Sequence, residues 1–351
     1  MNIPAKPWTK TNPPKKILAI RLQAMGDVLI TLPYLQHLRK SLPQSTQIDL
    51  LTREETESIP KNIVLFDKVF SIRGERNFRK QLFYAFLLLP KLLLHRYDVV
   101  IDLQNNPVSE IVRKVSMPKA WSVFDKFSPI AAGERTRLTI EAIGFKIKAA
   151  GNFYLKDPQQ GLKILKANGW KETAELIAIN PAGAFTTRSW SRENYIAFAK
   201  LWLAKFPDAK ILMMGTSFIA AKAAFMKNEL QERLINIVGL TTPAEAFAIM
   251  QRVKFMLSED SGLMHMAWIS GVPTLAMFGS TRSDWSKPLG EHTFFLDSSD
   301  LPCGNCMLQV CKFNDVRCLT RYTPEKIFQH ALELVQKSEV MRYQNNLSLL
   351  K

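Results

Sequence analysis

Short apolar runs alternate along the chain with longer segments in which apolar residues recur every three or four positions. The short runs predict buried strands, and the longer segments predict amphipathic helices. In the first half we expect strands at residues 17–20, 48–51, 64–70 and 99–103, and helices at residues 28–38 and 78–95. Strands that alternate with helices indicate a parallel sheet covered by helices.

The second half begins a new series of the same kind. Strands are predicted at residues 176–180, 210–215, 235–239 and 274–278, and helices at residues 192–206, 217–230, 243–252 and 324–338. A further strand begins at Phe255. The chain is therefore predicted to be of the α/β class, with two Rossmann-like domains of similar size.

The stretch 255–281 is the most informative part of the second series. Its apolar start predicts a strand that ends near Glu259 and Asp260, and Ser261 and Gly262 then turn the chain into a short helix. Ligands of open α/β sheets bind beyond the carboxyl ends of the strands, and a helix N-terminus there attracts anions. This unit therefore predicts a site for a phosphate-bearing ligand.

Composition and charge limit the kind of partner. The chain has 351 residues, is 47% hydrophobic and carries a net charge of +16, which is typical of a globular protein with an acidic partner. Residues 1–150 hold 24 Lys and Arg against 13 Asp and Glu. Nucleic acid, an anionic membrane surface and a phosphorylated substrate all fit this charge, and so does a solvated basic surface.

The proline-rich segment 1–14 predicts a poorly ordered tail, and it lacks the apolar core of a signal peptide, so we expect a cytoplasmic protein. Ordered domains are expected at residues 15–165 and 166–335, with a C-terminal tail at 336–351. The apolar segment 82–94 is too short to span a membrane. We expect it to be a buried helix, with docking on a membrane surface as the alternative.

Residues 107–151 have a weaker pattern, in which aromatic side chains lie among Lys and Arg. Such a mixture is typical of a nucleic-acid surface or of a face that binds an acidic acceptor. An irregular subdomain with buried aromatics is the alternative. The turn after the first strand has one glycine, Gly26, so the dinucleotide fingerprint G-x-G-x-x-G is missing, as is a Walker A motif. An oxidoreductase or a P-loop NTPase is therefore not expected.

Several blocks of the sequence together resemble a known family. They are the segments 16–21 and 25–33, the segment 181–190 with its Pro-Ala-Gly and Arg-Ser-Trp, and the segment 260–279 that begins Asp-Ser-Gly-Leu-Met-His. In this order they resemble glycosyltransferase family 9, the ADP-heptose:lipopolysaccharide heptosyltransferases. The resemblance runs from about residue 15 to about residue 338.

The resemblance implies a GT-B architecture, in which two facing Rossmann-like domains enclose an interdomain cleft. The first domain would bind the acceptor and the second the nucleotide sugar, and sugar transfer would be inverting and independent of metal. Such a displacement needs a base on the acceptor hydroxyl and stabilisation of the departing diphosphate. By resemblance, Asp27 is the base and Arg188, where the family usually has Lys, is the cation at the diphosphate. Without the resemblance, Asp27 would be interpreted as a helix N-cap.

The remaining candidates fall into two sets. Donor-binding residues are expected to be Gly183, Thr186, Thr187, Asp260, Ser261, Gly262, His265, Gly279 and Thr281. For Asp260 a helix cap is an alternative, and His265 is either a phosphate contact or a core histidine. Acceptor-binding residues are expected among the basic side chains of the first half, namely Arg21, Arg113, Lys114, Arg135 and Arg137.

The four cysteines form one cluster with the spacing C-x₂-C-x₄-C-x₆-C, at Cys303, Cys306, Cys311 and Cys318. In a reducing compartment this spacing favours a structural zinc site over disulfides, and free thiols are the alternative. Such a zinc ion would not be catalytic, because four thiolates would close its coordination sphere.

Taken together, these patterns predict a cytoplasmic enzyme that transfers a sugar, heptose from ADP-heptose, to a lipopolysaccharide or lipid A-core acceptor. It would require no cofactor for catalysis, would contact the anionic inner face of the membrane peripherally and would bind no nucleic acid. Two alternatives remain open: a nucleotide-sugar epimerase of the same fold, and a basic nucleic-acid-binding protein.

Overall fold

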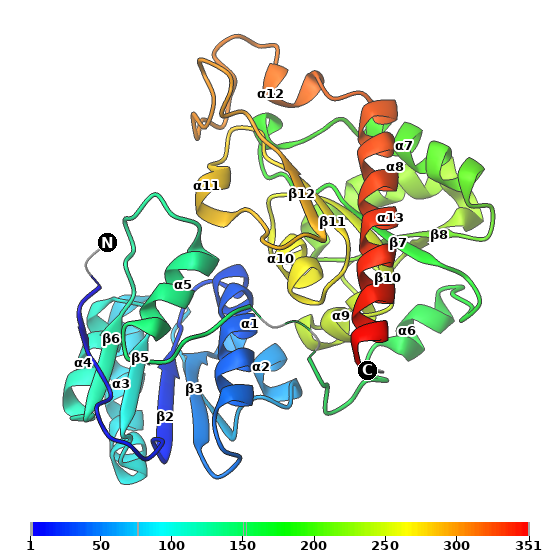
Figure 1. The fold of residues 1–351 in the computed structure, drawn as a ribbon. Helices are drawn as coiled ribbons and strands as arrows, with labels where there is room; N and C mark the ends of the chain where they lie inside the picture. The colour runs from blue at the N-terminus through cyan, green and yellow to red at the C-terminus, as the bar shows by residue number, and fades with distance from the viewer. Residues whose placement is uncertain (1–2, 76, 150, 152, 350–351) are drawn as a thin grey trace. The chain divides into compact units, whose positions relative to one another are not determined.

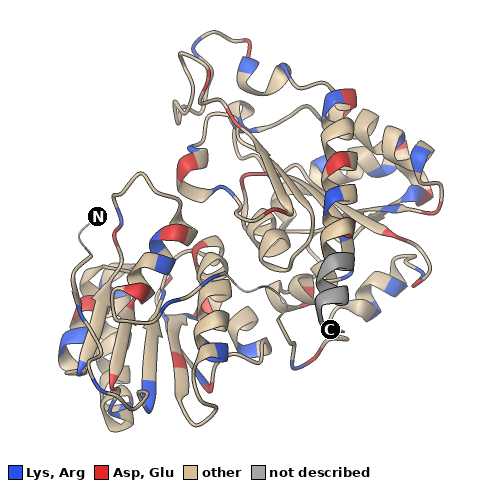
Figure 2. Cartoon of the chain, in the orientation of Figure 1, with Lys and Arg blue, Asp and Glu red and all other residues tan. Residues whose placement is uncertain are grey.

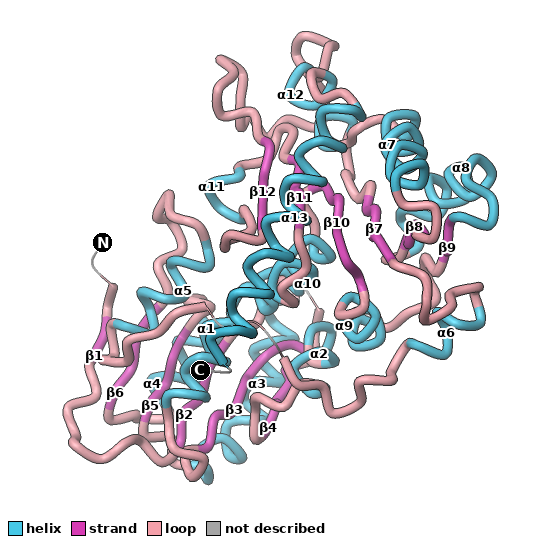
Figure 3. Tube along the Cα trace, turned by 45° about the vertical axis from the view of Figure 1, so that its right-hand side comes forward, coloured by secondary structure: helices cyan, strands magenta, loops and turns pink. Residues whose placement is uncertain are grey.

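The computed structural model describes residues 3–75, 77–149, 151 and 153–349. The chain divides into two compact units, residues 1–158 and residues 159–351. In each unit the strands form one sheet, and helices pack against the sheet (Figures 1 and 3). We expected the division after residue 165. It lies earlier because helix α6 (Leu162–Ala167) packs against α9 (Pro243–Met250) of the second unit.

The sheet of unit 1 has the order β1-β6-β5-β2-β3-β4, in which all neighbours are parallel except β1 and β6. Alternate residues of a strand point to opposite faces, so Leu18 and Ile20 of β2 share one core with α3 and α4. Helix α5 packs against α1. The elements are β1 (Ala5–Lys6), β2 (Lys16–Ile20), α1 (Met25–Ser41), β3 (Gln47–Arg53), α2 (Ser58–Asn62), β4 (Lys68–Ile72), α3 (Phe78–His95), β5 (Val99–Asp102), α4 (Pro107–Val115), β6 (Ala120–Val123) and α5 (Ala132–Glu141).

The sheet of unit 2 is entirely parallel, with the order β12-β11-β10-β7-β8-β9. Side chains of α7, α8 and α13 pack into one core with β7, β8, β10 and β11, among them Tyr195, Met226 and Leu334. Besides α6 and α9, the elements are β7 (Leu176–Asn180), α7 (Arg192–Lys205), β8 (Lys210–Met213), α8 (Ala220–Leu230), β9 (Leu234–Asn236), β10 (Val253–Glu259), α10 (Gly262–Ile269), β11 (Thr274–Met277), α11 (Ser283–Ser286), β12 (Thr293–Leu296), α12 (Arg317–Thr320) and α13 (Pro324–Leu349).

Parts of the chain that we expected to be irregular are built into the fold. Residues 5 and 6 form β1, the edge strand of the sheet, which pairs with β6, where Ala5 lies opposite Ser122. An edge strand has free backbone groups, and the prolines that flank β1 are tolerated there. Residues 5 and 6, which we expected in a poorly ordered tail, are therefore paired with the sheet, and disorder in the rest of residues 1–14 stays a prediction. Residues 107–141 form α4, β6 and α5, and the expected C-terminal tail at 336–351 continues α13 as far as Leu349.

Helix α3 also differs from its prediction. We expected a buried helix, but only one of its faces packs into the core, through Gln81, Ala85, Leu89 and Leu92. Side chains on the rest of the helix, Phe83 and Leu87 among them, are exposed. In the part of the chain that the structure describes, no helix has both the length and the apolar character needed to cross a membrane.

Candidate active site

In each sheet, the order in which the chain adds strands changes direction at one pair of neighbouring strands. In unit 1 this place lies between β2 and β5, and in unit 2 between β7 and β10. The loops that follow such a pair of strands diverge, and ligands of open α/β sheets bind in the crevice between them. Loops that follow three of these strands contain the candidates Arg21, Gly183, Thr186, Thr187, Arg188, Asp260 and Ser261, and the helices that come next begin with the segments that contain Asp27 and Gly262. Each unit therefore has its own candidate site.

In unit 2 the loop at residues 181–190 is anchored by a buried carboxylate. Glu259, the last residue of β10, accepts hydrogen bonds from the backbone N–H of Gly183 and from that of Trp190, the latter at 2.6 Å. Lys222 of α8 donates to the Pro181 carbonyl at 2.9 Å and to Ser189 Oγ at 2.7 Å. The loop is thus held near both of its ends.

Burial raises the pKa of Glu259 to about 7, although the charge of Lys222 and the two backbone donors oppose the shift. The carboxylate is fully buried. Neither Glu259 nor Lys222 was expected to contribute to the site. For Glu259 the available signal was its place at the end of a strand beside Asp260, whereas Lys222 comes from a helix that carries no motif.

Arg188 and Asp260 meet above the ends of β7 and β10. Arg188 Nη2 lies 3.3 Å from Asp260 Oδ2, and both side chains are partly buried. Ser286 Oγ lies 3.4 Å from the other oxygen, Oδ1, of Asp260. The structure therefore brings together the cation expected at the diphosphate and the carboxylate expected to help hold the nucleotide sugar.

The N-terminus of α10 begins directly after this pair. Ser261 caps the helix, because its Oγ accepts from Met264 N at 3.2 Å, and it also accepts from Asn180 Nδ2 at 2.7 Å. A Cβ placed on Gly262 would meet no atom within 4 Å, so there is open space beside the first turn. The first N–H groups of a helix have no partner within it, and the helix dipole favours an anion beside them.

The loop after β11 lies against the loop after β7. A Cβ on Gly279 would lie 2.1 Å from the Thr187 carbonyl, and Ser280 N donates to the same carbonyl at 2.9 Å. The hydroxyls of the two expected donor contacts Thr186 and Thr187 donate instead to the carbonyls of Gln309 and Leu308. Gly279 and these threonines thus position the loops.

Two expected donor contacts have contrasting surroundings. The hydroxyl of Thr281 is buried, and it has no hydrogen-bond partner among the residues that the structure describes. His265 is also buried, and its Nδ1 accepts a hydrogen bond from Trp268 Nε1 of the same helix at 3.2 Å. One ring nitrogen of His265 is therefore engaged inside α10, as expected of a core histidine.

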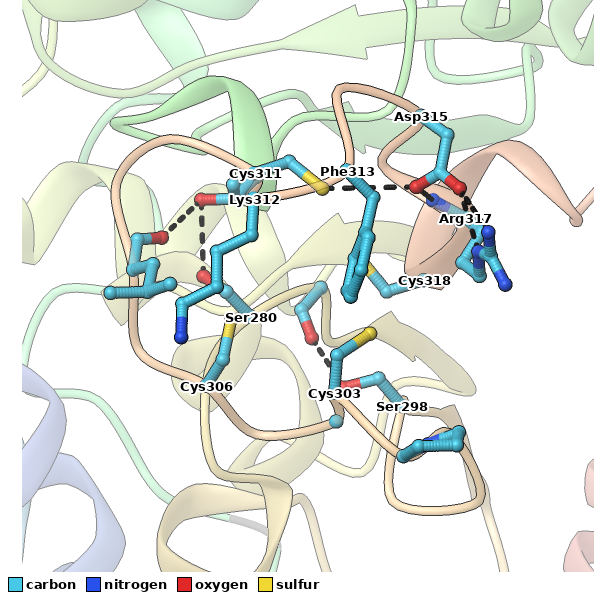
Figure 4. A pocket seen from close by; sticks show the side chains of 15 residues that line it. Ser280, Ser298, Cys303, Cys306, Cys311, Lys312, Phe313, Asp315, Arg317 and Cys318 are labelled. Carbon is cyan, nitrogen blue, oxygen red and sulfur yellow. Dashed lines mark hydrogen bonds and ion pairs between the residues drawn. The ribbon is translucent and has the colours of Figure 1, made fainter.

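The four cysteines line one cavity of about 370 Å³, next to the loops just described (Figure 4). All four are free thiols, and no three His, Cys, Asp or Glu side chains of the described residues are grouped so as to hold one metal ion. The expected structural zinc site therefore gains no support from this geometry. Backbone N–H groups of Phe313 and Val316 lower the pKa of Cys311, whereas burial raises that of Cys318.

In unit 1 the central feature is a carboxylate held by a buried arginine. Asp27 is the third residue of α1, and its carboxylate accepts from Ala24 N at 2.8 Å. Arg21 Nη2 lies 2.8 Å from the other carboxylate oxygen. The Asp27 side chain is 40% exposed, whereas that of Arg21 is 7% exposed. Asp27 is therefore fixed in orientation while one side of it stays open to solvent.

The loop around this pair is fixed by a neighbouring loop of the sheet. Gln104, which follows β5, accepts through Oε1 from the backbone N–H groups of Leu22 and Gln23, at 2.9 and 3.0 Å. The Arg21 guanidinium donates to the Leu103 carbonyl and lies 4.8 Å from the centre of the Phe124 ring. The loops after β2 and β5 thus hold the Arg21–Asp27 pair in place.

The other basic candidates of unit 1 are held in different ways. The Arg135 guanidinium also lies over Phe124, at 5.0 Å, so the structure brings Arg21 and Arg135 to one aromatic ring. The remaining three are directed at acids of the same unit: Arg113 at Asp102, Lys114 at Glu110, and Arg137 at Glu134 and Glu141. Their role toward an acceptor stays a prediction. Lys and Arg are spread over both units (Figure 2).

Comparison with known proteins identifies a family to which the chain is similar. Residues 87–317 match the model of "Glycosyltransferase family 9 (heptosyltransferase)". The chain is 22% identical to lipopolysaccharide heptosyltransferase 1 of Pseudomonas aeruginosa, in an alignment that covers 93% of this chain and 100% of that protein. It is 28% identical to lipooligosaccharide heptosyltransferase 2 of Campylobacter jejuni, where the alignment covers 47% of this chain and only about half, 53%, of the relative.

Solved structures agree on the fold. The E. coli heptosyltransferase WaaC, in its structure with ADP-2-deoxy-2-fluoro heptose, superimposes with a TM-score of 0.65 at 18% identity, over 91% of this chain and 99% of that one. This likeness confirms the α/β class and the GT-B type of fold, with two parallel-sheet units. Because the family model matches well over half of the residues, the chain belongs to glycosyltransferase family 9, the heptosyltransferase family.

Proposed function

We propose that this protein is an inverting heptosyltransferase that transfers heptose from ADP-heptose to a lipopolysaccharide core precursor. The observation that carries the proposal is the half-exposed Asp27 carboxylate, held by Arg21 and by the Ala24 N–H at the sheet's point of reversal. A carboxylate that is oriented but still open is suited to accept a proton from a bound hydroxyl. The membership of family 9 supports sugar transfer as the reaction.

In the proposed reaction Asp27 takes the proton of the acceptor hydroxyl. The hydroxyl oxygen then attacks the anomeric carbon of heptose from the side opposite to the diphosphate, and the new carbon–oxygen bond replaces the bond to the leaving oxygen. The electron pair of the broken bond stays on ADP, which leaves as an anion. A single displacement of this kind inverts the anomeric configuration. The Arg21 guanidinium keeps the Asp27 carboxylate in position during the proton transfer.

The donor site of unit 2 would stabilise the departing diphosphate. Arg188 contributes a fixed cation, and the capped N-terminus of α10 contributes backbone N–H groups and its dipole. Asp260, which pairs with Arg188, would orient both this cation and the hydroxyls of the sugar. These groups offset the developing charge by themselves, and we therefore propose that transfer is independent of metal ions.

The acceptor and the location follow from charge and from the relatives. Residues 1–150 carry a strong excess of basic side chains, which fits an acceptor with phosphates and acidic sugars. Arg21 and Arg135, which share the Phe124 ring, are the cations of unit 1 that we expect nearest to that acceptor. Such an acceptor is assembled on a lipid, so we place the enzyme at the cytoplasmic face of the inner membrane.

The proposal is tested by transfer and by binding. Purified protein is incubated with ADP-heptose and a lipid A-core precursor in the presence of EDTA, and the product is analysed for the new linkage and its anomeric configuration. We expect one heptose per acceptor, with inverted configuration. Thermal unfolding in ADP, UDP, GDP and CDP should show the largest protection by ADP. Protection by UDP or GDP instead would contradict the donor, and a retained configuration would contradict the mechanism.

A further inference from the structure

Helix α3 exposes a stripe of large apolar side chains on the side that faces away from its core. Its buried residues are Gln81, Ala85, Leu89 and Leu92. Phe83, Phe86, Leu87 and Leu94 follow one another at spacings of three, one and seven residues, which places them along one side of a helix. Their exposed fractions lie between 55% and 81%. Both sides of α3 are therefore apolar.

This stripe is the main concentration of exposed apolar side chains in the described residues. Of the 18 large hydrophobic residues that are exposed there, six belong to α3, which adds Phe78 and Leu93 to the four just named. Single exposed apolar residues are ordinary on protein surfaces, but a contiguous group of them marks a surface that contacts a partner.

The charges of α3 indicate which partner fits. The helix contains no Asp or Glu, and its cations Arg79, Lys80 and Lys91 are exposed, as is Arg96 directly after it. A symmetric contact between two copies would place these cations against each other, which is unfavourable. An apolar stripe with cations and no acids is typical of a helix that lies in the headgroup region of an anionic membrane.

We propose that α3 docks this protein on an anionic lipid bilayer. The helix would lie in the plane of the surface, with Phe83, Phe86 and Leu87 among the first acyl carbons and the three cations at lipid phosphates. This inference deepens the proposed function, which already places the enzyme at the membrane, by naming the helix that docks; the docking itself does not depend on which sugar is transferred. It rests on the proposed function in one respect only, namely that docking would bring the enzyme to a lipid-borne acceptor.

The test is sedimentation of the full chain with vesicles. Wild-type protein should bind phosphatidylglycerol vesicles and should bind phosphatidylcholine vesicles much more weakly. The variant Phe86→Ser with Leu87→Ser should bind phosphatidylglycerol at least about tenfold more weakly, since each side chain contributes apolar burial. The matched control is Phe218→Ser with Leu240→Ser, which changes two exposed apolar residues of unit 2 and should bind as the wild type does.

Two further measurements separate this proposal from its alternatives. Light scattering reports self-association, and loss of dimers in the Phe86→Ser, Leu87→Ser variant without a change in lipid binding would overturn the proposal in favour of an interface between copies. Unchanged vesicle binding in this variant and in Phe83→Ser would overturn it as well. Because these side chains are exposed, the variants should keep the wild-type melting temperature and should transfer heptose to a water-soluble acceptor at the wild-type rate. A wild-type protein that binds vesicles but transfers no heptose would contradict the proposed function alone.

Discussion

The two units place opposite kinds of group at the same position of the same fold. In unit 1 the point where the strand order reverses presents a carboxylate, Asp27, and keeps its arginine buried. In unit 2 the corresponding point buries its carboxylate, Glu259, and presents Arg188 and the N-terminus of α10. The buried member of each set fixes a loop, and the presented member is the one available to a ligand.

This contrast shows how one sheet topology presents a carboxylate in one unit and a cation with a helix N-terminus in the other. The topology determines only that two loops diverge, and the chemistry follows from which residue of the loop is buried. In unit 1 the buried group is a cation, Arg21, so an acid is left exposed. In unit 2 the buried group is an acid, Glu259, so the groups that remain available to a ligand are a cation and backbone N–H groups. Substitution of an accessible group, Asp27 or Arg188, should therefore reduce the transfer rate. Substitution of a buried group should mainly change the conformation of the loop and the stability of the protein.

The largest effect is expected for Asp27→Asn. The amide keeps the shape of the side chain but cannot take the proton of the acceptor hydroxyl, so the transfer rate should fall by about 10²-fold to 10⁴-fold. Protection of the protein by ADP should stay unchanged, because we propose that unit 2 binds the donor. The control is Glu55→Gln, another half-exposed carboxylate of unit 1 that pairs with an arginine, and it should transfer normally. Full activity of Asp27→Asn would remove Asp27 as the base.

The second largest effect is expected for substitution of Arg188, the accessible cation of unit 2. Arg188→Ala should slow transfer by about 10²-fold to 10³-fold, as loss of a group that stabilises developing charge does in other enzymes. Arg188→Lys keeps the charge and should restore most of this rate. Arg192→Ala removes a nearby arginine that pairs with Glu193 instead, and it serves as the control. If Arg188→Ala weakened only the binding of ADP and left the rate of bound substrate unchanged, Arg188 would act in donor binding alone.

The buried acid of unit 2, Glu259, should make the free energy of unfolding depend on pH. Burial raises the pKa of Glu259 to about 7 from an ordinary value of 4.5, so the folded protein holds a proton there that the unfolded chain has lost. The contribution of Glu259 to the free energy of unfolding therefore falls as the pH rises through this window, by about 3 kcal/mol in all, and levels off above it.

Glu259→Gln cannot ionise and should lose this part of the pH dependence. Urea unfolding at about pH 5 and at about pH 8 measures the difference between wild type and variant, with the fluorescence of Trp190 and Trp202 as the signal, since both lie in the core of unit 2. Glu175→Gln, which changes a surface acid, should follow the wild type. The same dependence in Glu259→Gln and wild type would mean that another group titrates.

Much of the fold was predictable because its signals are local. Apolar runs gave the central strands, and in unit 2 the end of β10 and the turn into α10 were expected from adjacent residues, although the cap of α10 is Ser261 and not Asp260. The pairing of Arg188 with Asp260 was not, because it joins residues 72 positions apart. The same holds for Lys222, whose contacts to the loop at residues 181–190 depend on how α8 packs.

The remaining differences between expectation and structure depend on which other part of the chain packs against a segment. An apolar helix such as α3 has the same local pattern whether its second face is buried or exposed, and the six exposed side chains appear only in three dimensions. The tail around β1 is ordered by a neighbour, β6, that lies more than a hundred residues away. Likewise the cysteine spacing predicted a metal site, but spacing alone does not determine whether loop residues converge.

The smallest expected effect tests how far the anion site of unit 2 depends on its cap. Ser261→Ala removes the acceptor that Met264 N and Asn180 Nδ2 share, which should cost about 1 kcal/mol of stability and weaken ADP binding by less than about tenfold. Ser261→Thr keeps the oxygen and should behave as the wild type. Ser191→Ala removes the cap of α7 and is the control: it should lose similar stability with unchanged ADP binding. The two alanine variants thus separate a helix end that only needs a cap from one that also holds a ligand. Equal ADP binding in both would show that the N-terminus of α10 does not contact the diphosphate, and the anion site would then rest on Arg188.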